Sequence, residues 1–456
     1  MITTAVVLLV GACGFVAVAV GIARKPEFAV VLVLLSELAV SRYALPPLSF
    51  GSLTIFLNDL PTLALLAAVV IRPYLGVARR RFSMTLLVVL LLAVLGLARG
   101  IRVFGLQVAG NNSREILAFA AAALFFSTVV ITPKFIDALR RWFTVTGGVL
   151  IVTALLFWAQ NGFGGFSTSG QRALRGLEAL ILLLATIITI VVPYGRTRTR
   201  NLTLPIIGFI VLVLTVQRSV AVAGIIALIV IVLIGGRVRT RRSSTVTRFL
   251  LVIGGLAVGF LVLAGPTGVT QDLGTALGTS TTQEGTFSWR LEGWRILISE
   301  QLSGSVPSIV VGEPAGSSNL RVIGESIVTV APHSEYVSLF KSVGIVGLAL
   351  MVWLLVATFR RNVVNVRSEY TFTATVGLLF ATMLASLVVY FITYSSGLTG
   401  GLVVGLSVSL AWFGAVDPER EAAGPEMEPS LPVAPPTTVP TSRRGAPPPI
   451  DQPVLS

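Results

Sequence analysis

The sequence predicts an all-α, polytopic membrane protein, a helical bundle of about 12–13 transmembrane helices with one large extracytoplasmic loop. Composition is the first observation behind this prediction. Of the 456 residues, 54% are hydrophobic and only 12% are charged, and the mean hydropathy is +0.89. A soluble domain carries roughly a quarter charged residues, so an ordinary soluble fold is excluded. The second observation is that apolar runs of bilayer length recur along the chain.

Each spanning helix is predicted from one apolar run, and some runs need flanking interfacial residues to cross a bilayer. The runs are Ile2–Ile22, Phe28–Val40, Leu57–Ile71, Met84–Leu97, Ile116–Ile131, Phe143–Trp158, Leu177–Val192, Leu202–Val216, Val220–Ile234, Phe249–Ala264, Tyr336–Phe359, Thr371–Tyr394 and Leu402–Val416. The run Phe28–Val40 is short and contains Glu37, so the number of helices stays open by one. If every run spans, the N-terminus lies outside and the C-terminus lies in the cytoplasm.

The net charge of +14 is distributed between apolar runs and does not form one patch. The basic clusters are Arg24 and Lys25; Arg72 and Arg79–Arg81; Lys134, Arg140 and Arg141; Arg196–Arg200; Arg237–Arg248; and Arg360, Arg361 and Arg367. They alternate with loops that are poorer in basic residues, which is the positive-inside pattern of membrane proteins. The pattern predicts cytoplasmic basic loops and accounts for the charge without a nucleic-acid partner.

Four regions follow from this organisation. Residues 1–264 hold the N-terminal spanning helices, residues 265–335 the extracytoplasmic loop, residues 336–416 the C-terminal helices and residues 417–456 a cytoplasmic tail. The tail contains about half of the 23 prolines and is predicted to be disordered. Because Cys13 is the only cysteine, a disulfide framework and a cysteine-based metal site are excluded.

His333 is the only histidine of the chain and follows Pro332, where the large loop re-enters the membrane. A side chain that titrates near neutral pH at this boundary could accept the proton of a hydroxyl nucleophile. The alternative is an interfacial histidine at a helix start. Glu335 beside it favours the helix dipole whether or not it assists chemistry.

Arg218 lies between two apolar runs that are joined with hardly any loop, and the positive-inside pattern puts this hairpin on the outer side. An outer arginine runs against the orientation bias, which favours a functional role over a topological one. The alternative is a guanidinium that reaches the headgroups from a tight hairpin. Further arginines of the outer loops, which could add to a cationic funnel, are Arg99, Arg102, Arg114, Arg172 and Arg175.

Arg290 and Trp294 are four residues apart in the large loop, which puts them on one face of a helix. An amphipathic helix on the outer bilayer surface would hold the tryptophan at headgroup level and offer the arginine to an anionic lipid head. The alternative is that the pair only anchors the loop to phospholipid.

Two acidic residues near membrane depth have adequate structural explanations. Asp59 precedes Pro61 and is predicted to cap a helix, and Glu37 is predicted to pair with an outer arginine such as Arg42. A functional role for either stays open.

The ordered set of these features resembles the O-antigen ligase and polymerase superfamily of polytopic glycosyltransferases. Its members show a Ser-Arg at an outer helical hairpin, an Arg-x-x-x-Trp followed by Pro and Gly, and a His-Asn-x-Tyr-Leu leading into Gly-x-x-Gly. The corresponding residues here are Arg218; Arg290, Trp294, Pro307 and Gly312; and His333, Tyr336, Val337, Gly344 and Gly347. This chain departs from the pattern with Gln217 before the hairpin arginine, Ser334 after the histidine and a looser pair of glycines, Gly312 and Gly316.

The resemblance implies transfer of a glycan from an undecaprenyl-diphosphate carrier to a hydroxyl of a glycan, lipid or protein acceptor, in surface polysaccharide biosynthesis. The reaction would take place at the outer face of the cytoplasmic membrane, without metal or cofactor. His333 would accept the proton, and Arg218 and Arg290 would hold the departing diphosphate. Trp294, Glu335 and Tyr336 would contribute to substrate binding.

Other functions stay open. A polymerase and a ligase need the same chemistry, so the sequence does not separate them. A polysaccharide or lipid transporter would also be polytopic, although transporters keep polar sites at the midplane in broken helices. A structural subunit of a glycan assembly complex is a third possibility.

Overall fold

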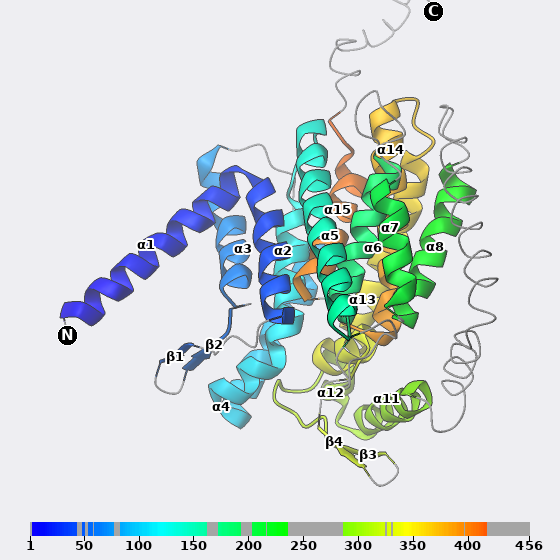
Figure 1. The fold of residues 1–456 in the computed structure, drawn as a ribbon. Helices are drawn as coiled ribbons and strands as arrows, with labels where there is room; N and C mark the ends of the chain where they lie inside the picture. The colour runs from blue at the N-terminus through cyan, green and yellow to red at the C-terminus, as the bar shows by residue number, and fades with distance from the viewer. Residues whose placement is uncertain are drawn as a thin grey trace, which may run out of the picture. The chain divides into compact units, whose positions relative to one another are not determined.

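In the residues that it describes, the computed structural model is all-α apart from two short hairpins, which confirms the all-α part of the predicted fold class (Figure 1). It describes residues 2–42, 48–50, 53–57, 59–76, 83–161, 172–192, 203–215, 217–235, 286–323, 326–329, 332–395 and 397–416. The chain divides into two units, Met1–Asp417 and Pro418–Ser456. The predicted run Phe249–Ala264, the first part of the large loop and the tail lie outside the described residues.

The helices are α1 (Ile2–Arg24), α2 (Pro26–Arg42), α3 (Asp59–Ile71), the 3-10 helix η1 (Arg72–Leu75), α4 (Met84–Ser127), α5 (Pro133–Asn161), α6 (Gly176–Val191), α7 (Thr203–Leu214), α8 (Arg218–Gly235), α11 (Thr286–Ser303), α12 (Val306–Val311), α13 (Glu335–Asn365), α14 (Thr371–Thr393) and α15 (Gly397–Phe413). Strands β1 (Leu48–Phe50) and β2 (Leu53–Ile55) form one antiparallel hairpin, and β3 (Arg321–Ile323) and β4 (Ser326–Val328) form another.

Five of the described helices are long and apolar enough to cross a membrane. They are the first half of α4, α5, α8, α13 and α14. The apolar helices α6, α7 and α15 and the part of α1 from Ala12 to Arg24 are shorter. Each predicted apolar run within the described residues coincides with a helix or with one half of α4. This is the make-up of a multi-pass membrane protein.

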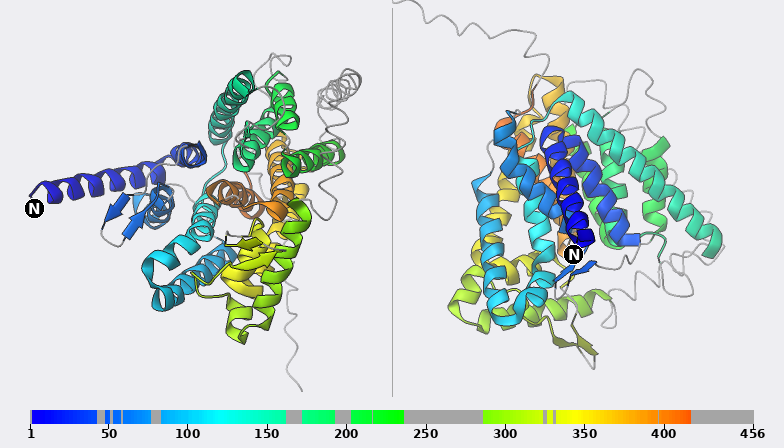
Figure 2. Two further views of the ribbon diagram at one scale, coloured as in Figure 1. Left: turned by 60° about the horizontal axis from the view of Figure 1, so that its bottom comes forward. Right: turned by 90° about the vertical axis from the view of Figure 1, so that its left-hand side faces the viewer.

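The segment between the runs Met84–Leu97 and Ile116–Ile131 is helical, so the expectation of an outer loop there is wrong. The helix α4 continues through this segment and breaks at Gly105 (Figure 2). The φ of Gly105 is 82°, a conformation that glycine adopts readily because it has no side chain. Ala93 of the first half and Ile116 of the second line one cavity, so the chain turns back at this break. Arg99, Arg102 and Arg114 therefore lie on helices near the turn.

The core of the described unit lies around α14, where 78% of the most apolar window is buried, against 28–39% in the other four long helices. Its neighbours include α6, α8, α13 and α15. The helix α15 packs closely along the second half of α4, because Gly401 and Gly405 lie against the backbone of Phe119 and Ala123. Small residues at such an interface let two helices approach within a membrane.

The described part of the large loop is anchored to α13 at a second break. At Gly344, with a φ of 68°, the helix is interrupted, and a side chain there would collide with the backbone of Val310 and Gly312. The Glu313 N–H donates to the Lys341 carbonyl (2.7 Å). This carbonyl lies in the turn before the break at Gly344, where carbonyls need hydrogen-bond donors from outside the helix. From α4, Arg99 Nη1 donates to the Gly312 carbonyl (2.9 Å). These contacts hold the segment that carries β3 against the bundle.

Helix direction separates the described bundle into two ends. We call the end where α2, α5 and α14 finish and α6, α8, α13 and α15 begin the site end; it is at the bottom of Figure 1. The described members of the predicted cytoplasmic clusters lie at or near the opposite end: Arg24, Lys25, Arg72, Lys134, Arg140, Arg141, Arg360, Arg361 and Arg367. The remaining clusters, Arg79–Arg81, Arg196–Arg200 and Arg237–Arg248, lie outside the described residues.

Candidate functional site

Arg290 of α11 binds the end of α14. Its Nη1 donates to the Thr393 carbonyl (3.3 Å), and its guanidinium lies 5.1 Å from the centre of the Tyr394 ring. A cation is stabilised at a helix C-terminus by the unpaired carbonyls and the helix dipole. The predicted helix around Arg290 and Trp294 is present as α11, and both side chains are half-buried. Arg290 therefore contacts the protein at the site end.

His333 is held beside the same helix end by the first turn of α13. Its neighbours Pro332 and Ser334 are buried, whereas His333 itself is exposed. The Ser334 hydroxyl donates to the Phe391 carbonyl (3.4 Å), and the Tyr336 hydroxyl donates to the Val388 carbonyl (3.0 Å). The last turns of α14 thus support both the histidine segment and Arg290.

The electrostatic surroundings of His333 favour its neutral form. Although part of the side chain is open to solvent, the surrounding protein desolvates the imidazole and lowers its pKa from the ordinary value, and the positive charges of Arg290 and Arg321 lower this pKa further. A neutral imidazole has a free nitrogen lone pair and can accept a proton. His333 is therefore a proton acceptor within electrostatic range of two guanidinium groups.

Arg321 was missed in the sequence. It is buried at the first position of β3, its Nη1 donates to the Asn319 carbonyl (2.9 Å), and its stem packs against Gly293 of α11. A Cβ at Gly293 would lie 2.8 Å from Arg321 Nε, so the glycine makes room for the Arg321 side chain in this position. Nothing in a three-residue strand with Arg321 at its start distinguishes this arginine from other loop arginines.

Arg218 lies exposed at the first position of α8, at the site end. The preceding Gln217 is buried, accepts a hydrogen bond from Arg172 Nη1 (3.2 Å) and donates one to the Leu174 carbonyl (2.8 Å). The same segment reaches Tyr394, because a Cβ at Gly176 would lie 3.2 Å from that ring. Gln217, which precedes Arg218, is therefore connected to the Tyr394 ring through the segment 172–176. Gln217 thus anchors the hairpin.

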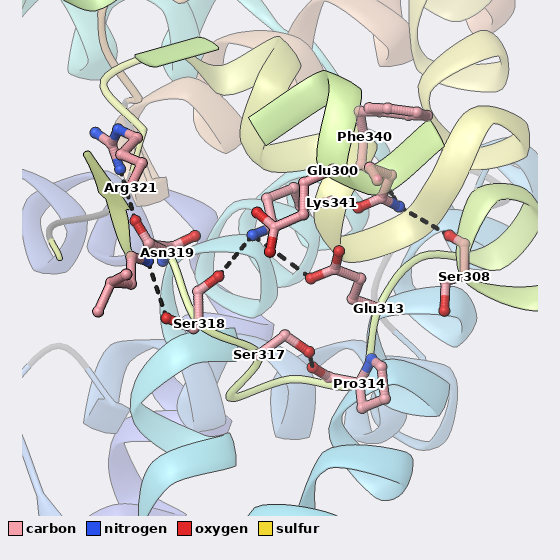
Figure 3. A network of polar contacts seen from close by, with 12 residues as sticks. Glu300, Ser308, Glu313, Pro314, Ser317, Ser318, Asn319, Arg321, Phe340 and Lys341 are labelled. Carbon is pink, nitrogen blue, oxygen red and sulfur yellow. Dashed lines mark hydrogen bonds and ion pairs between the residues drawn. The ribbon is translucent and has the colours of Figure 1, made fainter. Parts of the chain in front are cut away.

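Glu335 is buried in the first turn of α13 and lines a cavity of about 70 Å³ together with Lys341 and Glu313. Lys341 Nζ donates to the Ser318 carbonyl (2.9 Å) and lies 3.5 Å from Glu313 Oε2 (Figure 3). This pair fixes the segment that leads to Arg321. Lys341 was also missed, although a lysine inside the run Tyr336–Phe359 was a visible signal.

The predicted pairing of Glu37 with Arg42 is wrong. Arg42 Nε pairs with Glu178 Oε1 of α6 (2.7 Å), and Glu37 accepts a hydrogen bond from the Thr399 N–H at the start of α15 (3.3 Å). Residues five apart on a helix point about 140° away from each other, so the two side chains of α2 face different neighbours.

Asp59 has the structural role of joining two elements. It begins α3, accepts a hydrogen bond from the Phe56 N–H (2.8 Å) and pairs with Arg114 Nε of α4 (2.6 Å). The predicted position at a helix start is confirmed, and the pair with Arg114 is an addition that the sequence did not indicate.

Taken together, the described residues of the site end can hold an anion and accept a proton. Planar guanidiniums bind phosphate oxygens through two parallel hydrogen bonds, and His333 lies within the field of two of them. Trp294 shares a helix with Arg290, and Tyr336 and Glu335 follow His333 in the chain. No protein-family model matches the chain, and no curated protein matches it.

Proposed function

We propose that the protein is a membrane glycosyltransferase of the O-antigen ligase and polymerase type. It transfers a glycan from an undecaprenyl-diphosphate carrier to a hydroxyl acceptor in the synthesis of a bacterial surface polysaccharide. The observation that carries the proposal is the position of the only histidine, which precedes Ser334, a residue bonded to the last turns of α14, and lies within the field of Arg290 and Arg321. A neutral base beside an anion site is what this reaction needs.

In this proposal the site end faces the outside of the cytoplasmic membrane and about 12–13 helices span it. The support is the location of Arg360, Arg361 and Arg367 and the other described basic clusters at the opposite end. Basic residues concentrate on the cytoplasmic side of membrane proteins. The large loop, including α11, α12 and the β3–β4 hairpin, is then extracytoplasmic.

In the proposed step, the acceptor oxygen forms a bond to the anomeric carbon of the donor sugar, and the bond from that carbon to the diphosphate oxygen breaks. The bonding electrons leave with the lipid diphosphate, whose negative charge Arg290 and Arg218 stabilise. The proton of the acceptor hydroxyl moves to His333 and then to water. Trp294 contributes an apolar surface near Arg290, and Glu335 and Tyr336 border the acceptor side.

The replacement His333→Ala tests this assignment. We expect complementation of a deletion strain to fail, because the acceptor hydroxyl loses its base, while the variant still reaches the membrane in normal amount. The measurement is the size distribution of lipid-linked and surface glycan. Single repeat units on the carrier would indicate a polymerase, and long chains left on the carrier would indicate a ligase. Normal glycan with an inserted variant would remove the proposed role of His333.

A transporter is the second candidate, and one observation favours it. The helices α4 and α13 are both broken, at Gly105 and Gly344, as are many transporter helices at their substrate sites. However, Gly344 lies close to the start of a 31-residue helix, and Gly105 lies at the turn of α4, so both breaks are near the site end. A transporter would move the glycan without releasing undecaprenyl diphosphate, so extraction of this lipid from vesicles and its measurement by mass spectrometry distinguish the two functions.

A further inference from the structure

A second polar cavity opens at the site end between α2, α4 and the segment that enters α15. Its volume is about 560 Å³, which is within the range of ligand sites. The polar side chains that line it include Glu37, Asn111, Asn112, Glu115, Asn319 and Ser395. Apolar lining comes from Val108, Ala118, Leu177 and Leu398. The proposed transfer step uses none of these residues.

The two carboxylates of this cavity are held in place by neighbouring elements. Glu37 is buried against the start of α15, where it accepts the hydrogen bond from the Thr399 N–H. Glu115 accepts a hydrogen bond from the Ser395 hydroxyl and is nevertheless exposed to the cavity. Arg114 also lines the cavity, but it is paired with Asp59. The lining therefore presents two carboxyl groups and one arginine that is already paired.

This cavity adjoins a smaller one that lies near the segment of His333. Asn112, Glu115 and Asn319 line both this cavity and the smaller one next to it. The smaller cavity reaches Pro332 and Glu335, which flank the histidine segment. A ligand in the larger cavity would thus approach His333 from the side of α4, while Arg290 approaches from the end of α14.

We propose that the larger cavity binds a sugar unit of the hydroxyl acceptor, and that this unit carries no carboxylate or phosphate. Sugar hydroxyls donate to carboxylates and exchange hydrogen bonds with amides, whereas the apolar lining suits their C–H faces. A carboxylate or phosphate on the sugar would lie against Glu37 and Glu115, while Arg114, which also lines the cavity, is already paired with Asp59. This inference rests on the proposed glycan transfer, because it assigns the acceptor side of that reaction.

The test measures binding of two probes to the full-length protein in lipid nanodiscs. The first probe is a neutral oligosaccharide fraction released from the envelope glycan of the source bacterium, followed by saturation-transfer NMR. The second is undecaprenyl diphosphate, followed by tryptophan fluorescence. We expect Glu115→Gln to weaken oligosaccharide binding at least about tenfold by removing charge-assisted hydrogen bonds. We expect this variant to bind undecaprenyl diphosphate as the wild type does. We expect Arg290→Ala to bind undecaprenyl diphosphate more weakly and the oligosaccharide as the wild type does.

A second variant of the cavity and one variant outside it show whether an effect on binding is specific to the cavity. Asn112→Ala removes an exposed amide of the same cavity and is expected to weaken oligosaccharide binding as well. Glu369→Gln changes an exposed carboxylate at the opposite end and is expected to have no effect.

The outcomes separate the inference from the proposed function. Oligosaccharide binding that is absent, or unchanged in both cavity variants, overturns the inference, and diphosphate binding that depends on Arg290 then still supports the proposed transfer. Diphosphate binding that is absent or independent of Arg290 overturns the proposed transfer, and oligosaccharide binding that depends on Glu115 then still supports the cavity as a sugar site. Equal binding of a uronic-acid oligosaccharide contradicts the preference for an uncharged sugar.

Discussion

Two arginines of the site end and three arginines of the opposite end differ in how they are held. At the site end, Arg290 and Arg321 are held against protein, one at the C-terminus of α14 and one against Gly293 of α11. At the opposite end, Arg360, Arg361 and Arg367 are exposed, and Arg361 lies over the Trp412 ring (4.4 Å). Exposed arginines near a bilayer set orientation, whereas guanidiniums fixed beside a base can bind a ligand. The same residue type therefore serves topology at one end and, in our proposal, chemistry at the other.

The largest expected contrast is between Arg290→Ala and Arg367→Ala. We expect Arg290→Ala to lower the rate of glycan transfer at least about 100-fold, because a preorganised donor to the leaving diphosphate is lost. Arg367→Ala is its matched control at the opposite end and is expected to transfer at the wild-type rate. The measurement is the release of undecaprenyl diphosphate by each purified variant. Equal rates for the two variants would abolish the distinction between the ends.

A smaller effect is expected for Arg321→Ala. Loss of this positive charge raises the pKa of His333, so a larger share of the imidazole is protonated at low pH. Because the neutral form accepts the proton, the acid limb of the pH–rate profile moves to higher pH. The rate at a fixed pH on that limb then falls about tenfold if the pKa of His333 rises by one pH unit. A lower rate with an unchanged profile would assign Arg321 a structural role only.

The smallest expected effect is that of Trp294→Ala. Its loss removes an aromatic contact near Arg290, which is worth about a two- to tenfold change in the apparent KM for the lipid-linked donor. The kcat is expected to stay near the wild-type value, since Trp294 does not contact the reacting atoms in the proposal. A large fall in kcat with an unchanged KM would contradict this division.

The apolar runs predicted the helices well, because residues such as those of α14 must be apolar whether they face lipid or the core. The helix α11 was expected from the spacing of four residues between Arg290 and Trp294, which is also a local feature of the sequence. The turn of α4 was missed because its polar residues, including Asn111, Asn112 and Arg114, resemble a loop. In the structure they line a cavity, and cavities are made by distant segments.

Side-chain pairing was predicted less well than helix position. Glu37 and Arg42 are near each other in sequence, but each bonds to a different helix. Arg321 approaches His333 only because the Gly312 and Gly344 backbones meet and the Lys341–Glu313 pair holds the intervening segment. Such long-range contacts leave no periodic pattern in the sequence.

The central claim is that desolvation, together with the positive charges of Arg290 and Arg321, keeps His333 neutral at a site for a lipid diphosphate. Because His333 is the only histidine, an NMR pH titration of ¹⁵N-histidine in the tag-free protein reports this group alone. We predict a pKa below the ordinary value of about 6.5, a higher pKa in Arg290→Ala, and a higher pKa when undecaprenyl diphosphate binds and offsets the two positive charges. A pKa at the ordinary value that responds neither to Arg290→Ala nor to undecaprenyl diphosphate would contradict the claim.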